Sequence, residues 1–77
     1  MDIREVFARN LRKYRRLKGL SQEAVAHEAG IDRSYISALE RSAYSASITM
    51  VDKIAKVLGV DAASLLQRPP KTGRARR

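Results

Sequence analysis

The sequence lacks cysteine and tryptophan, and aromatic side chains make up only 5% of its 77 residues. Without cysteine, neither a disulfide nor a cysteine zinc site can stabilise the chain. One histidine, His27, and scattered carboxylates give no cluster with metal-ligand spacing, so we expect no metal and no other cofactor. We interpret His27 as a surface residue. Regular helix packing and association with a second copy remain as sources of stability for so small a chain.

Long apolar runs and catalytic motifs are also missing. No stretch approaches the roughly 20 apolar residues of a membrane span, and the charged start MDIREVF is unlike a signal peptide. We therefore expect a protein of the bacterial cytoplasm or nucleoid with no membrane partner. No Ser–His–Asp, Cys–His, paired-carboxylate or phosphate-loop arrangement is present, so an enzyme is not expected. We also expect no further segment that binds a small-molecule ligand.

Positive charge is unevenly distributed along the chain. The formal net charge is +8, and residues 67–77 hold five basic residues and no acid, which leaves +3 on residues 1–66. A basic chain of this size indicates nucleic acid or an anionic membrane as partner. We predict one domain over residues 1–66 and a basic, disordered tail over residues 67–77. The tail either adds salt-sensitive DNA affinity or only increases solubility.

Helical periodicity runs through the whole domain, and no segment alternates with period two. Residues 3–18 predict a first helix with an apolar face of Ile3, Val6, Phe7, Leu11, Tyr14 and Leu17. Further helices are expected over residues 22–28 and 33–41, between the cap Ser47 and Gly59, and after the cap Asp61. Pro69 and Pro70 prevent continuation of the last one. The expected fold is all-α, a compact five-helix bundle.

Residues 22–41 read as two short helices joined by a tight turn. Gly30 lies where the chain needs the left-handed conformation, and Asp32 can cap the helix that follows. Ala26 is small enough for the two helices to cross closely. The outward positions of the second helix are expected to be Arg33, Ser34, Ser37, Ala38 and Arg41. This is the pattern of a helix-turn-helix, whose second helix enters the major groove of double-stranded DNA.

Residues at the start of this second helix are the candidates for reading bases. Arg33 can pair with guanine O6 and N7, which is worth roughly 1–3 kcal/mol of discrimination. Ser34 and Ser37 can contact several bases, and Ala38 could touch a thymine methyl. The alternative for Arg33 is a contact with phosphate only.

Other residues are candidates for contacts with the DNA backbone. Gln22 opens the preceding helix, whose N-terminus suits a phosphate. Tyr35 either offers its hydroxyl to a phosphate or packs partly in the core. Tyr44 contacts phosphate, contacts a second copy or covers the core. The full set of phosphate candidates is Gln22, Tyr35, Arg41, Lys18 and Tyr44.

Apolar residues near the C-terminal end exceed what so small a core needs. We expect part of them to form a two-fold interface of a homodimer. The alternative is that all of them belong to the core of one copy. The candidate interface residues are Ile48, Val51, Leu58, Leu65 and Leu66.

The pattern LRKYRRLKGLSQEAVAHEAGIDRSYISALER, followed by SITMVDKIAKVLGV, resembles the Cro/repressor type of helix-turn-helix protein, often called the XRE family. The segment DRSYISALER is also similar to the small controller proteins that regulate restriction–modification operons. The resemblance implies a lambda-repressor-like five-helix domain and a homodimer on a two-fold symmetric operator.

The resemblance also implies particular roles. Arg15 and Glu40 would form an ion pair that links the first and third helices, and Gln22 would brace the third. Glu23 is either a carboxylate that suits a helix N-terminus or an acidic contact for RNA polymerase, as in some activating members. The family's usual glycine is replaced by Ser42, so this turn is either strained or different.

These observations together predict a sequence-specific, DNA-binding transcriptional regulator, a repressor or autoregulator. The alternative is an antitoxin-type or other protein-interaction module that also binds DNA. A basic amphipathic binder of membranes is disfavoured because the apolar face of the first helix is needed in the core.

Overall fold

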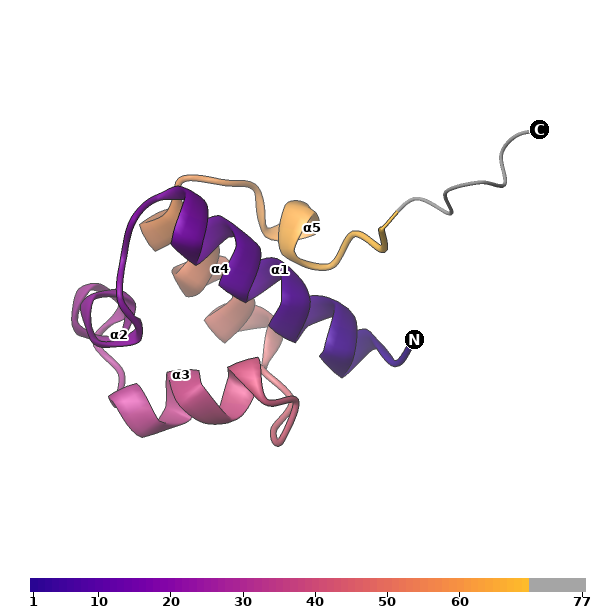
Figure 1. Cartoon of the computed structure of the whole chain (residues 1–77), viewed down its shortest axis with the longest axis horizontal. Helices are drawn as coiled ribbons and strands as arrows, with labels where there is room; N and C mark the ends of the chain where they lie inside the picture. Colours follow the sequence, from indigo (N-terminus) through magenta and orange to yellow (C-terminus); the bar gives the residue numbers. More distant parts are fainter. Residues whose placement is uncertain (70–77) are drawn as a thin grey trace.

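The computed structural model describes residues 1–69, and within them the chain forms five helices and no strand (Figure 1). The helices are α1 (Ile3–Leu17), α2 (Gln22–Ala29), α3 (Arg33–Glu40), α4 (Ile48–Leu58) and α5 (Ala62–Leu65). The predicted all-α fold is confirmed, and the expected helix ends differ by one residue. No helix in this part of the chain is long and apolar enough to cross a membrane.

Side-chain caps begin four of the helices. Asp2 accepts a hydrogen bond from Arg4 N–H, Ser21 from Ala24 N–H, and Ser47 from Met50 N–H. Asp32 caps α3 in the same way. Such a bond satisfies an N–H group that has no partner inside the helix. Asp61 occupies the cap position of α5, as predicted, but its side chain makes no capping hydrogen bond.

α1 is the central element of the bundle. It packs against α3 on one side and α5 on another, while α2 packs against α3 and α4 (Figure 1). The core contains Leu11, Ile36, Leu39 and Ile54, all with no measurable exposure. Two residues of the expected apolar face of α1 are not in this core. Ile3 and Leu17 are 45% and 74% exposed, because they lie at the ends of the longest helix, beyond the helices that cover its middle.

Three of the five expected interface residues are also placed differently. Val51, Leu58 and Leu65 have 5%, 4% and 0% exposure within one copy of the chain. They lie in the cluster that joins α4 and α5 to α1 and α3, so the prediction that they form a two-fold interface is wrong. Ile48 and Leu66 remain exposed, at 88% and 40%.

The chain after α5 is fastened to α1. The Asn10 side chain donates through Nδ2 to the carbonyls of Leu65 and Gln67, each at 2.9 Å, and Arg68 Nη1 donates to the Met1 carbonyl at 2.5 Å. Residues 67–69 of the expected tail therefore lie along the domain. The remainder of that tail, residues 70–77, is outside the described residues.

The turn after α3 holds a serine in a conformation that favours glycine. Ser42 has φ of 61°, and its N–H donates to the Leu39 carbonyl while Ala43 N–H donates to the Ala38 carbonyl. The turns after α1, α2 and α4 use the same pair of bonds with Gly19, Gly30 and Gly59 at φ of 72–74°. The family's usual turn is therefore kept, and Ser42 is strained in it.

Replacing Ser42 by glycine should stabilise the domain by about 0.5–1 kcal/mol, because the left-handed penalty of a side chain exceeds the backbone entropy that glycine loses. Thermal unfolding should show the midpoint about 4 °C higher. Ser45→Gly, in the same loop but without a positive φ, is the control and should give no gain. Equal midpoints for Ser42→Gly and the parent chain would show that the turn is unstrained.

Candidate nucleic-acid interface

The turn between α2 and α3 fixes how the two helices cross. Gly30 has φ of 72°, and the N–H groups of Gly30 and Ile31 close α2 on the carbonyls of His27 and Ala26. Asp32 then accepts from Ser34 N–H and starts α3. Ala26 is buried, as expected for the close contact between α2 and α3. One side of α3 therefore faces α1 and α2, and the other side is left exposed (Figure 1).

Ala38 does not lie on the exposed side of α3. It is 5% exposed, so the expectation that it faces outward is wrong, and it cannot meet a thymine methyl without movement of α3. The cause is that α3, which has only eight residues, packs against both α1 and α2. Contacts with two helices bury a wider part of its circumference than contact with one helix would. The turn through Ser42 and Ala43 also folds back onto this end of the helix.

The other three base-reading candidates lie together and are each hydrogen-bonded. Arg33 Nη1 donates to Gln22 Oε1 at 3.4 Å, and the Ser34 hydroxyl donates to the Asp32 carboxylate. Ser37 Oγ accepts from Arg41 Nη1 at 2.6 Å. Arg33, Ser34 and Arg41 are exposed, and Ser37 is half-buried. The exposed side of α3 thus presents donors whose positions are already held.

Two hydrogen bonds from Ser34 stabilise the ionised form of the Asp32 carboxylate. Hydrogen bonds from the Ser34 hydroxyl and then from the Ser34 backbone N–H lower the pKa of Asp32 below its ordinary value. A carboxyl group with a lowered pKa contributes its full stabilisation above the ordinary value and loses it as the pH falls through the lowered one. The cap of α3 is therefore complete at neutral pH.

A buried carboxylate joins α1, α2 and α3. Glu40 is 5% exposed, and its two oxygens lie 2.6 Å from Arg15 Nε and 3.1 Å from Arg15 Nη2. Gln22 Nε2 also donates to this carboxylate at 3.1 Å, which turns the Gln22 carbonyl oxygen toward Arg33. The ion pair that the resemblance implied is present, and a chain of contacts runs from α1 to the exposed side of α3.

Arg12 adds a contact to this network that sequence reasoning did not identify. Its Nη1 donates to the main-chain carbonyl of Glu40, at the C-terminal end of α3. The spacing could have indicated this contact, because Arg12 and Arg15 lie three residues apart and therefore share one face of α1.

Of the remaining phosphate candidates, Tyr35 and Tyr44 lie together at α3, whereas Lys18 lies at the C-terminal end of α1 beside Gly59, and none of them joins the network. Tyr35 is half-buried and Tyr44 is 57% exposed, with ring centroids 6.1 Å apart and planes tilted by 31°. Lys18, at the end of α1, is exposed. His27 and Glu23 are exposed on α2. Among residues 1–69 no group of three potential metal ligands is found.

Two short helices crossed at a left-handed glycine, with a donor-rich side of the second left open, define a helix-turn-helix. The family model described as Helix-turn-helix matches residues 11–65. The chain belongs to this family, in its XRE type, a family of DNA-binding transcriptional regulators. The resemblance drawn from the sequence is confirmed.

Relatives with solved structures share this fold. A hypothetical transcription factor from Neisseria meningitidis is 44% identical over 68 residues, which cover 88% of this chain and 64% of that protein. The chain thus spans less than two thirds of the length of this relative. The crystal structure of a Neisseria hypothetical transcription factor matches with a TM-score of 0.86, at 44% identity over 88% of this chain and 78% of that one.

Two further structures bear on the class of regulator. The restriction–modification controller protein C.AhdI from Aeromonas hydrophila matches with a TM-score of 0.78 at 37% identity, over 80% of this chain and 94% of that chain. The N-terminal DNA binding domain of SinR from Bacillus subtilis matches with a TM-score of 0.80 at 31% identity, over 87% and 99%.

Removing the carboxylate of Glu40 should strongly destabilise the domain. Glu40→Ala leaves the Arg15 guanidinium, with its side chain 13% exposed, without its partner, and the expected loss is about 3–5 kcal/mol. Urea unfolding followed by circular dichroism measures it. Asp52→Ala breaks the exposed pair with Lys56 and is the control, with an expected loss below about 1 kcal/mol. Similar losses in both variants would contradict a structural role for Glu40.

Proposed function

We propose that this protein is a sequence-specific transcriptional regulator that acts as a homodimer on a two-fold symmetric operator and has no enzymatic activity. The observation that carries this is the exposed side of α3, where Arg33 is held by a Gln22 that Glu40 orients. Each copy places α3 in one major groove, with half-sites about 34–36 Å apart. The relative SinR, whose matching part is described as a DNA binding domain, supports the same use of this fold.

Base reading depends on Arg33 and phosphate contact on the residues around α3. Arg33 pairs with guanine by exchanging its weak bond to Gln22, at 3.4 Å, for two bonds to O6 and N7. Ser34 and Ser37 contact neighbouring bases and specify less. The phosphates on either side are met by Gln22 at the N-terminus of α2 and by Tyr35, Arg41 and Lys18.

The dimer forms through an apolar end patch, which we define as Ile3, Tyr44, Ile48 and Leu66. These are 45%, 57%, 88% and 40% exposed, and Ile48 is the most exposed large apolar side chain within residues 1–69. Ile3, Tyr44 and Leu66 border a shallow groove of about 80 Å³, whose only charged lining residue, Arg4, is paired with Asp2. A clustered apolar surface of this kind is typical of an interface.

Regulation follows from association. Repression, including repression of its own gene, requires only that the dimer occupies an operator, so occupancy depends on protein concentration. The relative C.AhdI, described as a restriction–modification controller protein, supports a role of this type. Glu23 is exposed on α2 and is available to RNA polymerase beside the bound DNA.

Selection of bound duplexes from random DNA tests base reading. The parent chain should enrich a two-fold symmetric motif, and Arg33→Ala should relax one guanine preference by roughly 1–3 kcal/mol, about 5- to 150-fold. Arg41→Ala is the matched control, since loss of a phosphate contact weakens binding to every sequence and lowers the salt slope by about 1. No enriched motif, with binding that follows salt alone, would overturn the proposal.

Sedimentation equilibrium tests the dimer. Ile48→Glu should raise the dimer dissociation constant at least about tenfold, because it places a charge without a partner in the interface. Leu17→Glu is the control: Leu17 is 74% exposed but lies at the opposite end of α1 from Ile3, about 21 Å away. The assigned patch is wrong if Leu17→Glu dissociates the dimer and Ile48→Glu does not.

A further inference from the structure

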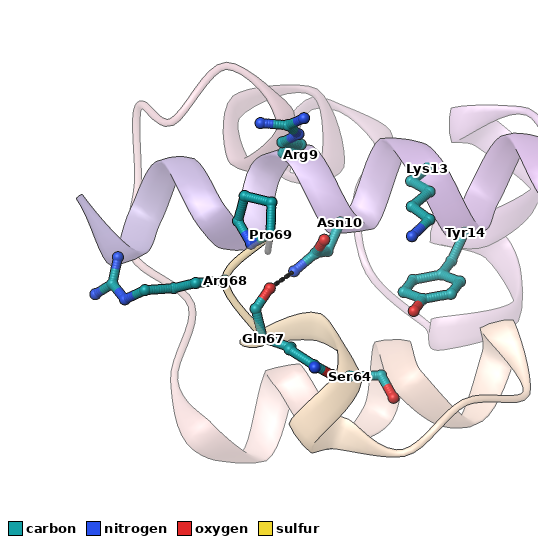
Figure 2. Close-up of a pocket in the computed structure, with 8 residues that line it drawn as sticks. All are labelled: Arg9, Asn10, Lys13, Tyr14, Ser64, Gln67, Arg68 and Pro69. Carbon is teal, nitrogen blue, oxygen red and sulfur yellow. Dashed lines mark hydrogen bonds between the residues drawn. The ribbon is translucent and has the colours of Figure 1, made fainter. Parts of the chain in front are cut away.

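A second groove lies on the side of α1 that faces the C-terminal segment. It has a volume of about 690 Å³ and runs between α1 and residues 64–69 (Figure 2). α3 packs on a different side of α1, so the groove is turned away from the exposed side of α3 (Figure 1). DNA bound along α3 would leave this groove open.

Three positive side chains line the groove, and no acidic residue does. Arg9 and Lys13 come from successive turns of α1, and Arg68 comes from the segment after α5, where its side chain points away from the other two and donates to the Met1 carbonyl (Figure 2). Like charges four residues apart on a helix repel one another. Within residues 1–69 none of the three forms an ion pair, whereas Arg4, Arg15 and Lys56 do. An anion bound between Arg9 and Lys13 would relieve this repulsion.

The base of the groove holds an acceptor without a donor. Asn10 is 8% exposed and uses Nδ2 to bond the carbonyls of Leu65 and Gln67. No donor within residues 1–69 reaches its Oδ1. A buried acceptor left without a partner carries a desolvation penalty, which a donor group of an occupant can relieve.

We propose that this groove binds an acidic segment of a partner protein. Aspartate and glutamate side chains pair with Arg9 and Lys13, and a backbone N–H of the same segment donates to Asn10 Oδ1. A phosphate backbone offers the charge but not this donor. Tyr14, with Lys13 Nζ 5.2 Å from its ring centroid, gives the peptide an apolar wall.

The occupant is not part of this chain. Residues 70–77, next in sequence to the groove, contain Lys71, Arg74, Arg76 and Arg77 and no acid. No two of the eight acidic residues in the sequence are adjacent, so a second copy offers no acidic run. None of these 77 residues supplies the acidic run, so the occupant we assign is an acidic segment of a different protein.

Fluorescence anisotropy with a fluorescein-labelled Gly-Asp-Glu-Asp-Glu-Gly peptide tests the proposal on the full chain. The double variant Arg9→Gln, Lys13→Gln should bind about tenfold more weakly. The double variant Lys53→Gln, Lys56→Gln loses the same charge from α4, outside the groove, and should bind like the parent. Equal weakening in both variants would show attraction by net charge only and overturn the proposal.

Two further measurements locate the peptide and separate it from other anions. Amide chemical shifts should change at Arg9, Asn10, Lys13 and Gln67, and changes confined to α3 would overturn the assignment. A backbone N-methylated peptide of the same charge should bind about threefold to tenfold more weakly, because it cannot donate to Asn10. Equal affinity for the two peptides would contradict the acidic-peptide assignment.

This inference is independent of the proposed function. Peptide binding should persist when the chain is saturated with duplex DNA, since the groove and α3 lie on different sides of α1. A chain that selects no DNA motif but binds the peptide through Arg9 and Lys13 would leave the groove assignment intact. If the chain selects a DNA motif but the peptide binds both double variants equally, the groove assignment is wrong and the proposed regulator function still stands.

Discussion

The position of α3 depends on one buried carboxylate. Glu40 is held by Arg15 and Gln22, and Arg12 bonds its main-chain carbonyl, so side chains from α1 and α2 meet on the last residue of α3. Apolar packing alone tolerates small rotations of a helix, whereas directional hydrogen bonds to a charge do not. Removing one partner leaves a buried charge, so the network is either complete or strongly destabilising. The orientation of the exposed side of α3 follows from it.

Most of the helix boundaries could be predicted because their signals are local. Ser21, Asp32 and Ser47 each bond an N–H two or three residues ahead, and Gly30 or Gly59 closes a helix within its own turn. Such features need no knowledge of the rest of the fold. The short α5 is less well specified, since Asp61 takes the cap position without the bond and Leu65 is held by packing.

Features that depend on neighbouring helices could not be predicted from periodicity. Ala38 is small and lies at the edge of the apolar face of α3. It is buried because both α1 and α2 pack against this helix, which the sequence does not show. Val51 and Leu65 looked surplus to a small core because the sequence does not show how tightly α4, α5 and α1 close around them. The bond from Asn10 to Gln67 joins residues 57 apart, and no local pattern indicates it.

The bonds that Arg33, Ser34 and Ser37 make in the free protein also bear on how an operator is found. If α3 reads bases as proposed, each of these side chains keeps a protein partner at a non-matching base, which limits the penalty there. On such sequences the protein is held by phosphate contacts alone, which permit sliding and hopping along the duplex. The protein would stay long only on sequences whose bases form stronger hydrogen bonds with these side chains than their partners within the protein do. Under the proposed function, the three bonds that order these side chains would therefore also keep the search fast.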